Sequence, residues 1–346
     1  RRFGAGLYVS EMITARGFLL GNKLTQLLAS SRADESPRSV QIYGSDPADV
    51  EAFARALADA GVAHLDMNFG CPVPKVTRSG GGSAIPLRPR LLAKLVRAAV
   101  RGAGSVPVTI KVRKGTDAEH LSFVAAGRVA QEEGAVAIGL HARTAAQLYA
   151  GQADWDAIRE LKQSVAIPVL GNGDIWECWD ALAMLRATGC DGVIVGRGCL
   201  GRPWLFRELA DVCAGREPAP PPRFGEIAAI ALEHGTGLVD FFGPRMGMLQ
   251  MRKWAAWYTK GFRGGNAVRA GLNKLHTLDD LRALLGSLDA DEPFPRAALR
   301  AQRAKGGREQ TVALPHGWLD DPLADTAPDA ACDADESVAE SALQGG

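Results

Sequence analysis

The chain has 346 residues, of which 47% are hydrophobic and 23% charged, an ordinary composition for a globular protein with a large core. No stretch approaches the roughly 18 uncharged apolar residues of a membrane span, and the first residues do not resemble a signal peptide. The six cysteines form no CxxC pair and stand apart from any histidine cluster. We therefore expect no metal site and a reducing, cytoplasmic environment.

The net charge of +1 conceals an uneven distribution. Residues 319–346 carry six Asp and two Glu but no Lys or Arg, which leaves +9 on residues 1–318. The part of the chain before this acidic segment is thus basic, which favours an anionic partner.

Apolar, β-branched runs recur in the first 200 residues and are typical of strands buried on both faces of a parallel sheet. They cover residues 7–12, 40–43, 64–68, 108–112, 137–141, 169–171 and 193–196. Helical patterns lie between them, at about 46–60, 89–101, 117–133, 154–164, 176–187 and 203–213. This alternation predicts an α/β fold of the TIM (β/α)₈ barrel type. Only seven strands are visible, so we expect the first strand upstream of residue 1.

Composition and sequence pattern divide the chain into three regions. Residues 1–214 are predicted to form the barrel, and the proline-rich stretch 218–222 is a stiff linker. Residues 215–288 show helical patterns without a strand signal and predict a small all-helical domain. Residues 289–346 are rich in Pro, Ala, Asp and Gly and predict a mostly disordered, acidic tail.

Functional groups of such barrels lie at the C-terminal ends of the strands. Cys71 stands there, in the segment Asn-Phe-Gly-Cys-Pro at 68–72, followed by a glycine loop at 79–83. A mobile loop beside a thiol could admit substrate and exclude water. A buried structural cysteine beside a glycine turn is the alternative, although the placement between Gly and Pro favours function.

Polar residues mark the ends of other strands. Lys111 lies within an apolar run, where an ammonium is costly unless it meets an anion such as a cofactor phosphate or a reduced flavin. His141 and Arg143 follow another strand and point to the same side of an extended backbone. The imidazole can donate to a carbonyl, and the guanidinium can hold a phosphate or a base.

The last two strands end in Asn-Gly-Asp at 172–174 and Gly-Arg-Gly at 196–198. Many barrels build a phosphate site from these two loops, because glycine lets backbone N–H groups approach phosphate oxygens and Arg197 adds charge. Gln41 is a polar amide in an apolar strand and needs a partner, for example the edge of a flavin ring.

Together these segments closely resemble the tRNA-dihydrouridine synthases, and among them the bacterial B-type branch. The resemblance rests on residues 66–72, Lys111, 141–144, 172–174 and 196–197, with support from Ser-Glu-Met at 10–12 and Gly-Arg-Pro-Trp at 201–204. It covers about residues 5 to 285 in the order and spacing of the family.

The resemblance implies an FMN-containing barrel and a helical tRNA-binding domain. Such an enzyme reduces the C5–C6 double bond of specific uridines in tRNA to 5,6-dihydrouridine, using NADPH. Reduced flavin gives hydride to C6, and Cys71 is implied to protonate C5. Carried over by position, the FMN contacts are Gln41, Lys111, His141, Asn172, Gly173, Asp174, Gly196 and Arg197, and Asn68 is a uracil contact. The family's first strand carries a Pro-Met-Ala-Gly type segment that lines the flavin, and a chain without it is expected to bind FMN poorly.

A tRNA partner also fits the charges of the helical region. Residues 243–276 contain seven basic residues and no acidic one, which predicts an RNA surface. Arg252 and Lys253 are candidate RNA contacts, together with Arg143 from the barrel. The interleaved Trp254, Trp257 and Tyr258 fit core packing better than base stacking. We expect a monomer that binds neither a membrane nor a metal.

Two other functions remain open from the sequence. A flavin barrel acting on a free pyrimidine, like the dihydroorotate and dihydropyrimidine dehydrogenases, would share the barrel and an acid–base residue but needs no basic helical domain. A non-catalytic RNA-binding protein could keep the barrel as a scaffold, although the full set of polar strand ends argues against it.

Overall fold

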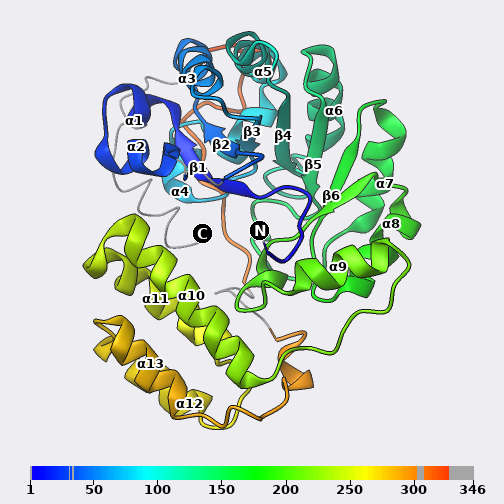
Figure 1. Cartoon of the computed structure of the whole chain (residues 1–346). Coiled ribbons are helices and arrows are strands. Elements are labelled where there is room, and N and C mark those ends of the chain that lie inside the picture. The colour runs from blue at the N-terminus through cyan, green and yellow to red at the C-terminus, as the bar shows by residue number, and fades with distance from the viewer. Residues whose placement is uncertain (1, 31, 33–34, 302–307, 327–346) are drawn as a thin grey trace. The chain divides into compact units, whose positions relative to one another are not determined.

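The computed structural model describes residues 2–30, 32, 35–301 and 308–326, and the chain divides into two compact units. The barrel unit contains Gly6–Asp174, Ala183–Ile194 and Gly306–Gly346. The helical unit contains Arg1–Ala5, Ile175–Leu182 and Val195–Lys305. Each unit is described by itself below (Figure 1).

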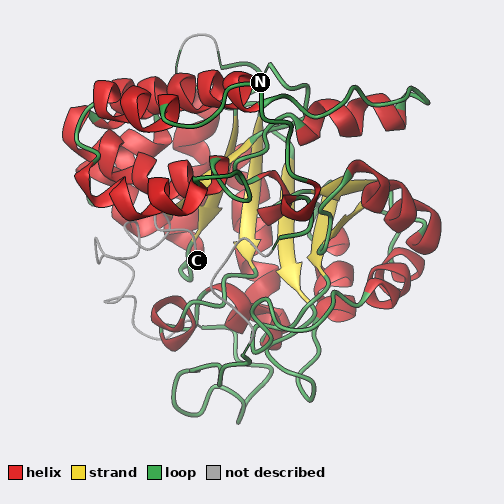
Figure 2. Ribbon diagram, turned by 90° about the horizontal axis from the view of Figure 1, so that it is seen from below, coloured by secondary structure: helices red, strands yellow, loops and turns green. Residues whose placement is uncertain are grey.

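The barrel unit is built on a curled parallel sheet of seven strands that pair in chain order (Figures 1 and 2). The strands are β1 (Val9–Thr14), β2 (Ser39–Tyr43), β3 (His64–Phe69), β4 (Val108–Arg113), β5 (Ala137–His141), β6 (Val169–Asn172) and β7 (Gly192–Ile194). Every predicted strand is present, which confirms the α/β barrel class. Within the described residues the sheet ends at β1 and β7.

Helices follow most strands and lie outside the sheet (Figure 1). They are α1 (Ala15–Leu19), α2 (Lys23–Ala29), α3 (Pro47–Asp59), α4 (Pro74–Arg78), the 3₁₀ helix η1 (Gly82–Leu87), α5 (Pro89–Ala103), α6 (Phe123–Glu132), α7 (Trp155–Ser164) and α8 (Cys178–Thr188). The start of α3 follows local rules: the Asp46 carboxylate accepts from the N–H groups of Ala48 and Asp49, and Pro47 fits the first turn. The short helices α1, α2 and α4 were not expected.

One helix begins later than the sequence predicted. Residues 117–122 are not helical, and α6 starts at Phe123. The Asp117 carboxylate accepts from the N–H groups of Glu119 and His120, and Gly115 forms an antiparallel bridge with Leu121. These contacts close a turn and so use the backbone groups that a helix would need.

The two faces of the sheet differ because side chains alternate along each strand. One set of positions is apolar and wholly buried, including Leu65, Met67, Ile110, Ile138 and Leu140. The alternate set carries polar residues on β2, β3 and β4. The core therefore fills one face, and the other face is left for the polar groups described below.

The helical unit is built from helices that pack around an apolar core. They are η2 (Arg197–Cys199), α9 (Leu205–Cys213), α10 (Phe224–Phe242), α11 (Pro244–Tyr258), α12 (Gly265–Gly271), η3 (Leu272–Lys274), α13 (Leu278–Gly286) and η4 (Arg296–Ala298). Trp204, Phe224, Met251 and Leu281 are among the buried residues of this core. Tyr258 is buried in it as well, as expected for a core aromatic.

The boundary between the units differs from the predicted one at residue 214. Arg202 explains the difference: its guanidinium is buried and donates to the carbonyls of Trp176 (2.9 Å) and Leu299 (3.2 Å). These contacts tie residues 175–182 and 195–214 to the helical unit. A long-range contact of this kind has no local sequence pattern.

No helix in the described part of the chain is long and apolar enough to cross a membrane.

Candidate active site

A chain of hydrogen-bonded polar side chains lines one face of β2, β3 and β4. Asp66 is its centre: its carboxylate accepts from Gln41 Nε2 (2.6 Å) and from the Thr109 hydroxyl (2.5 Å). Gln41 Oε1 accepts from Asn68 Nδ2 at 2.8 Å, and His64 Nε2 lies 3.0 Å from Thr109 Oγ1. The register places Gln41 opposite Asp66, and Asp66 opposite Thr109. Burial raises the pKa of Asp66 and lowers that of His64.

Gln41 and Asn68 keep some hydrogen-bonding capacity within this chain. Gln41 uses one of its two amide hydrogens on Asp66. The Asn68 amide nitrogen donates to Gln41 and lies 3.6 Å from Met12 Sδ, while Asn68 Oδ1 accepts from the Gly70 N–H at 3.0 Å. A second lone pair on Asn68 Oδ1 and a second Gln41 hydrogen are therefore available to a bound molecule.

Lys111 lies opposite Asn68 in the register of β3 and β4. Burial, together with the nearby Arg113, lowers the pKa of Lys111 to about 8, although Asp66 and Cys71 act in the opposite direction. Within the described residues the ammonium has no hydrogen-bond or ion-pair partner. A half-buried cation without a partner among the described residues is a site for an anionic or strongly accepting group.

Space for the Lys111 side chain depends on a glycine that the sequence did not single out. Gly139 on β5 lies opposite Lys111. A Cβ at Gly139 would lie 3.5 Å from Lys111 Cγ and only 2.7 Å from Ile194 Cδ1. A larger residue there would collide with β7 and crowd the lysine.

Cys71 lies in the loop after β3, and backbone carbonyls fix that loop. Arg113 Nε donates to the carbonyl of Gly70 at 3.0 Å, and the Ser83 N–H donates to the carbonyl of Cys71 at 3.0 Å. The thiol is 8% exposed. Burial raises the pKa of Cys71, and the Val73 N–H, Arg113 and Lys111 reduce the shift without reversing it. The thiol is therefore protonated at neutral pH.

The glycine segment after Cys71 is packed rather than open. Gly82 begins η1 with a φ of +53°, and a Cβ there would lie 2.6 Å from the Cys71 carbonyl oxygen. Ser83 is buried as well. The sequence suggested a mobile loop at 79–83, whereas the described contacts hold this segment against Cys71.

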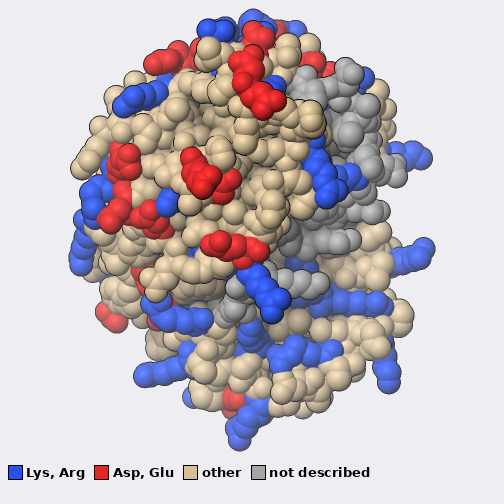
Figure 3. Space-filling view, turned by 180° about the vertical axis from the view of Figure 1, so that it is seen from behind, with Lys and Arg blue, Asp and Glu red and all other residues tan. Residues whose placement is uncertain are grey.

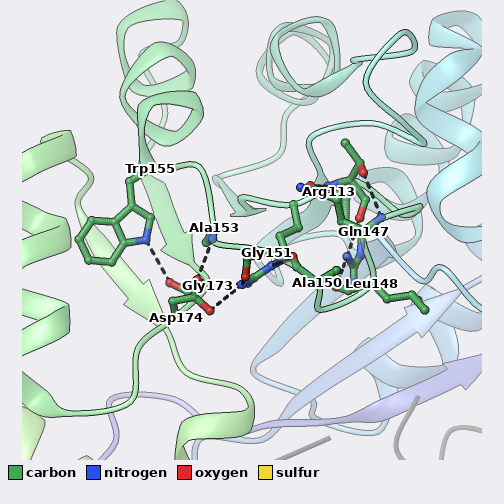
Figure 4. A network of polar contacts seen from close by, with 11 residues as sticks. Arg113, Gln147, Leu148, Ala150, Gly151, Ala153, Trp155, Gly173 and Asp174 are labelled. Carbon is green, nitrogen blue, oxygen red and sulfur yellow. Dashed lines mark hydrogen bonds and ion pairs between the residues drawn. The ribbon is translucent and has the colours of Figure 1, made fainter. Parts of the chain in front are cut away.

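Two buried arginines fix the loop that follows β5 (Figure 4). Arg113 Nη1 donates to the carbonyls of Thr144 (2.9 Å) and Leu148 (3.0 Å). Arg143 is 2% exposed and donates to the carbonyls of Ala150 (3.0 Å) and Gly151 (2.7 Å).

Arg143 also forms an ion pair with Asp174 after β6, with Nη2 lying 2.8 and 2.9 Å from the two carboxylate oxygens. Asp174 in turn accepts from the Ala153 N–H at 2.7 Å. Arg143 Nη1 is buried and has no partner within the described residues, so its two N–H groups stay available to a bound group. Arg143 and Asp174, predicted as separate ligand contacts, thus lie together and hold the loop.

His141, Asn172 and Gly173 lie beside this loop. His141 pairs with Asn172 across β5 and β6, and Asn172 Nδ2 donates to the carbonyl of Ile194 at 2.7 Å. The Gly173 carbonyl accepts from Trp155 Nε1 at 3.1 Å. Gly173 has a φ of +128°, and a Cβ there would lie 2.6 Å from the Cβ of Ala153. The structure therefore brings 141, 172, 173 and 174 to neighbouring strand ends.

Four predicted site residues belong to the helical unit. Gly196 precedes η2, and the Arg197 guanidinium lies 5.1 Å from the centre of the Trp176 ring. Arg252 donates from Nε and Nη2 to the carbonyl of Leu275 (3.1 and 2.9 Å), so part of its guanidinium is used within the unit.

Lys253, the fourth of these residues, lies over the Trp254 ring. Other basic side chains of the same region are exposed: Arg245, Arg263, Arg269 and Lys274.

The sequence missed Asp66, Thr109 and Gly139 as site residues. Alternation along β3 carried a signal for Asp66, since it lies two residues before Asn68 and so on the same face. Thr109 has the same relation to Lys111. Only the strand register reveals that these residues meet.

The dihydrouridine synthase (Dus) family matches residues 1–294. A probable tRNA-dihydrouridine synthase of Mycobacterium leprae is 52% identical over 322 residues, which cover 92% of this chain and 84% of that protein. The tRNA-dihydrouridine synthase B of Pseudomonas putida is 38% identical over 306 residues, which cover 88% of this chain and 90% of that protein.

Proposed function

Since the chain belongs to the dihydrouridine synthase family, we propose that this oxidoreductase reduces the C5–C6 double bond of specific uridines in tRNA, with FMN as cofactor, NADPH as reductant and Cys71 as proton donor. The observation that carries the proposal is the position of the buried Cys71 thiol, in the loop that follows β3, the strand whose polar Asn68 lies opposite Lys111. The reaction is expected to take place in the cytoplasm, in a monomer that needs no metal.

The polar face fits a flavin. Lys111 is half-buried and offers an ammonium that lacks a partner within the described residues, and Gln41 offers a second amide hydrogen. Flavin carbonyls and a reduced, anionic ring would accept from both groups. When bound, FMN would supply the hydride that reaches C6 of the uracil.

The phosphate of FMN also finds suitable groups. His141, Asn172, Gly173 and Asp174 cluster at the ends of β5 and β6, where glycine lets the backbone approach a ligand closely. Gly196 and Arg197 stay proposed phosphate contacts on the basis of the family resemblance. Asp174 acts through Arg143 and Ala153, because its carboxylate is bonded to both.

Cys71 has the protonation state that the reaction requires. Hydride addition at C6 leaves an enolate across C5, C4 and O4, and an acid must then protonate C5. Burial raises the pKa of the Cys71 thiol, so the proton is present at neutral pH. The S–H bond breaks, a C5–H bond forms, and the resulting thiolate lies near Lys111 and Arg113 before solvent returns its proton. Asn68 Oδ1 is the proposed acceptor for the uracil N3–H.

The tRNA substrate must be held while one uracil leaves its stack, which costs a few kcal/mol. Phosphate contacts elsewhere offset that cost. The exposed cations of residues 243–276 are the proposed contacts. Arg245, Arg263, Arg269 and Lys274 are exposed, whereas Arg252 is partly used on Leu275.

The test is Cys71→Ala. We expect the variant to keep FMN binding, tRNA binding and flavin reduction by NADPH, and to lose most uridine reduction because C5 has no acid. Stopped-flow absorbance follows the flavin, and mass spectrometry of the tRNA counts dihydrouridine. Cys213→Ala is the matched control, since Cys213 is an exposed cysteine and its removal should leave both steps unchanged.

Unchanged uridine reduction in Cys71→Ala would show that the proton comes from another group. Turnover of free uracil or dihydroorotate without turnover of tRNA would contradict the substrate class itself.

A further inference from the structure

A segment outside the region matched by the family, residues 308–326, makes specific contacts within the barrel unit. Composition assigned it to a disordered tail. We propose that Gln310 of this segment is a positioning residue that fixes the loop bearing Cys71 for proton transfer. The inference rests on the proposed role of Cys71.

Three consecutive carbonyls of the Cys71 loop accept from three different elements. The Gly70 carbonyl accepts from Arg113 Nε on β4 at 3.0 Å. The Cys71 carbonyl accepts from the Ser83 N–H on η1 at 3.0 Å. The Pro72 carbonyl accepts from Gln310 Nε2 at 3.0 Å. Hydrogen bonds thus fix the loop backbone at the residue before Cys71, at Cys71 itself and at the residue after it. Gln310 makes the hydrogen bond at the residue after Cys71.

Gln310 is itself held by the loop that follows β5. Its N–H donates to the carbonyl of Ala146 at 2.8 Å, and its side-chain amide reaches the carbonyl of Ala145 at 3.4 Å. One residue therefore connects the loop after β3 to the loop after β5, which Arg113 and Arg143 also fix. Both of these loops carry proposed active-site residues.

A buried tryptophan anchors the segment eight residues further on. Trp318 is 2% exposed, and its Nε1 donates to the carbonyl of Ala84 at 3.0 Å. The Arg88 guanidinium lies 3.7 Å from the centre of the Trp318 ring, and Arg88 Nε donates to the Trp318 carbonyl at 3.2 Å. Lys94 forms an ion pair with Asp325 at 2.7 Å. The partners of the segment lie on η1, on α5 and at Arg88 between these two helices. They fix the position of the segment and with it the position of Gln310.

Proton transfer is sensitive to such placement, because a displacement of about 1 Å at a reacting group can cost on the order of 100-fold in rate. Among the described residues Gln310 hydrogen-bonds only to backbone carbonyls, so its side chain is not expected to alter the acidity of the thiol directly. Its loss should therefore slow the protonation step and leave flavin reduction unaffected.

The experiment compares Gln310→Ala and Gln310→Glu with the unmodified protein. The glutamate keeps the shape of the side chain but offers an acceptor to carbonyls that need a donor. Two readouts are made: the rate of Cys71 alkylation by iodoacetamide, followed by peptide mass spectrometry, and single-turnover reduction of tRNA uridine. We expect alkylation to speed up and uridine reduction to slow down, each by about tenfold, as for the loss of one buried hydrogen bond. FMN content, flavin reduction by NADPH and the KM for tRNA should stay unchanged.

Glu309→Gln is the matched control, since Glu309 is the exposed neighbour of Gln310 and its change should affect neither readout. An unchanged alkylation rate in both Gln310 variants would overturn the positioning role. If alkylation speeds up while Cys71→Ala retains full uridine reduction, the proposed function of Cys71 fails instead, because alkylation reports the loop without any turnover.

Discussion

At the scale of single residues, burial affects the protonation of both Lys111 and Cys71, but with different consequences for the proposed reaction. Burial disfavours the charged form of each. For the thiol this preserves the proton that the proposed reaction uses. For Lys111 it creates a cation that is easily neutralised and that gains from a bound anion or acceptor.

FMN binding should therefore depend on pH through Lys111. The pKa of Lys111 is about 8 in the flavin-free protein, and a bound acceptor raises it, so binding takes up a proton above pH 8. We expect FMN affinity to be constant just below pH 8 and to fall by up to tenfold per pH unit above it. Fluorescence titrations between pH 7.5 and 9.5 measure this dependence.

Lys111→Met is the companion variant. It should bind FMN about tenfold or more weakly at pH 7.5, since a charge-assisted hydrogen bond is lost, and its affinity should show no decline above pH 8. Lys162→Met is the control, because Lys162 is ion-paired to Asp191 on the outside of the barrel unit. A decline that persists in Lys111→Met would assign the titration to another group.

The sequence indicates candidate residues where strand ends are concerned, and their roles in the site stay predictions. Lys111, Cys71 and the segment 172–174 could be singled out because a polar group interrupts or ends an apolar run. Contacts between residues that lie far apart in the sequence could not be predicted. The bond between Arg143 and Asp174 joins loops 31 residues apart, and nothing local distinguishes it from two independent ligand contacts.

At the scale of elements, the loop after β5 depends on Arg143. Replacement by Met would remove the donors for Ala150, Gly151 and the Asp174 carboxylate together. Losing one partner of a buried ion pair typically costs about 3–5 kcal/mol, so we expect Arg143→Met to lower the free energy of unfolding by that amount. Urea unfolding followed by circular dichroism measures it.

Arg159→Met is the control for this loss, since Arg159 is a half-exposed arginine whose ion pair with Asp156 lies on the surface. Such pairs contribute about 0–1 kcal/mol. A similar small loss in Arg143→Met would mean that water replaces the guanidinium without penalty.

The seven strands could be predicted because each contains closely spaced apolar residues, and most long helices could be predicted because their caps and glycine stops are local. The short helices α1, α2 and α4 contain five, seven and five residues, too few for a periodic pattern. The segment 308–326 was missed for another reason: one tryptophan and one glutamine fix it, and a composition rich in Pro, Ala and Asp hides two such residues.

At the scale of the whole molecule, positive and negative charges are unevenly distributed along the chain. Lys and Arg side chains gather over the helical unit in Figure 3, where residues 243–276 carry seven basic residues and no acidic one. Binding of tRNA should consequently weaken as salt rises, since each phosphate contact releases counterions.

We expect Arg245→Gln and Arg269→Gln each to reduce the slope of log K against log salt by about 1 if each removes one phosphate contact. Filter binding at several salt concentrations gives the slopes. Arg282→Gln is the control within the same unit, because Arg282 forms an ion pair with Asp279 on α13. Equal slopes for all variants would place the tRNA on a different surface.

Gly82 has a consequence for recognising other members of the family. A side chain at that position would meet the Cys71 carbonyl oxygen at 2.6 Å, in a backbone conformation that already favours glycine. A sequence that keeps the cysteine but carries a bulky residue eleven positions later must therefore fold this loop along another path. A cysteine–glycine pair at this spacing is thus a more selective criterion than the cysteine alone when an uncharacterised genome is searched for competent enzymes.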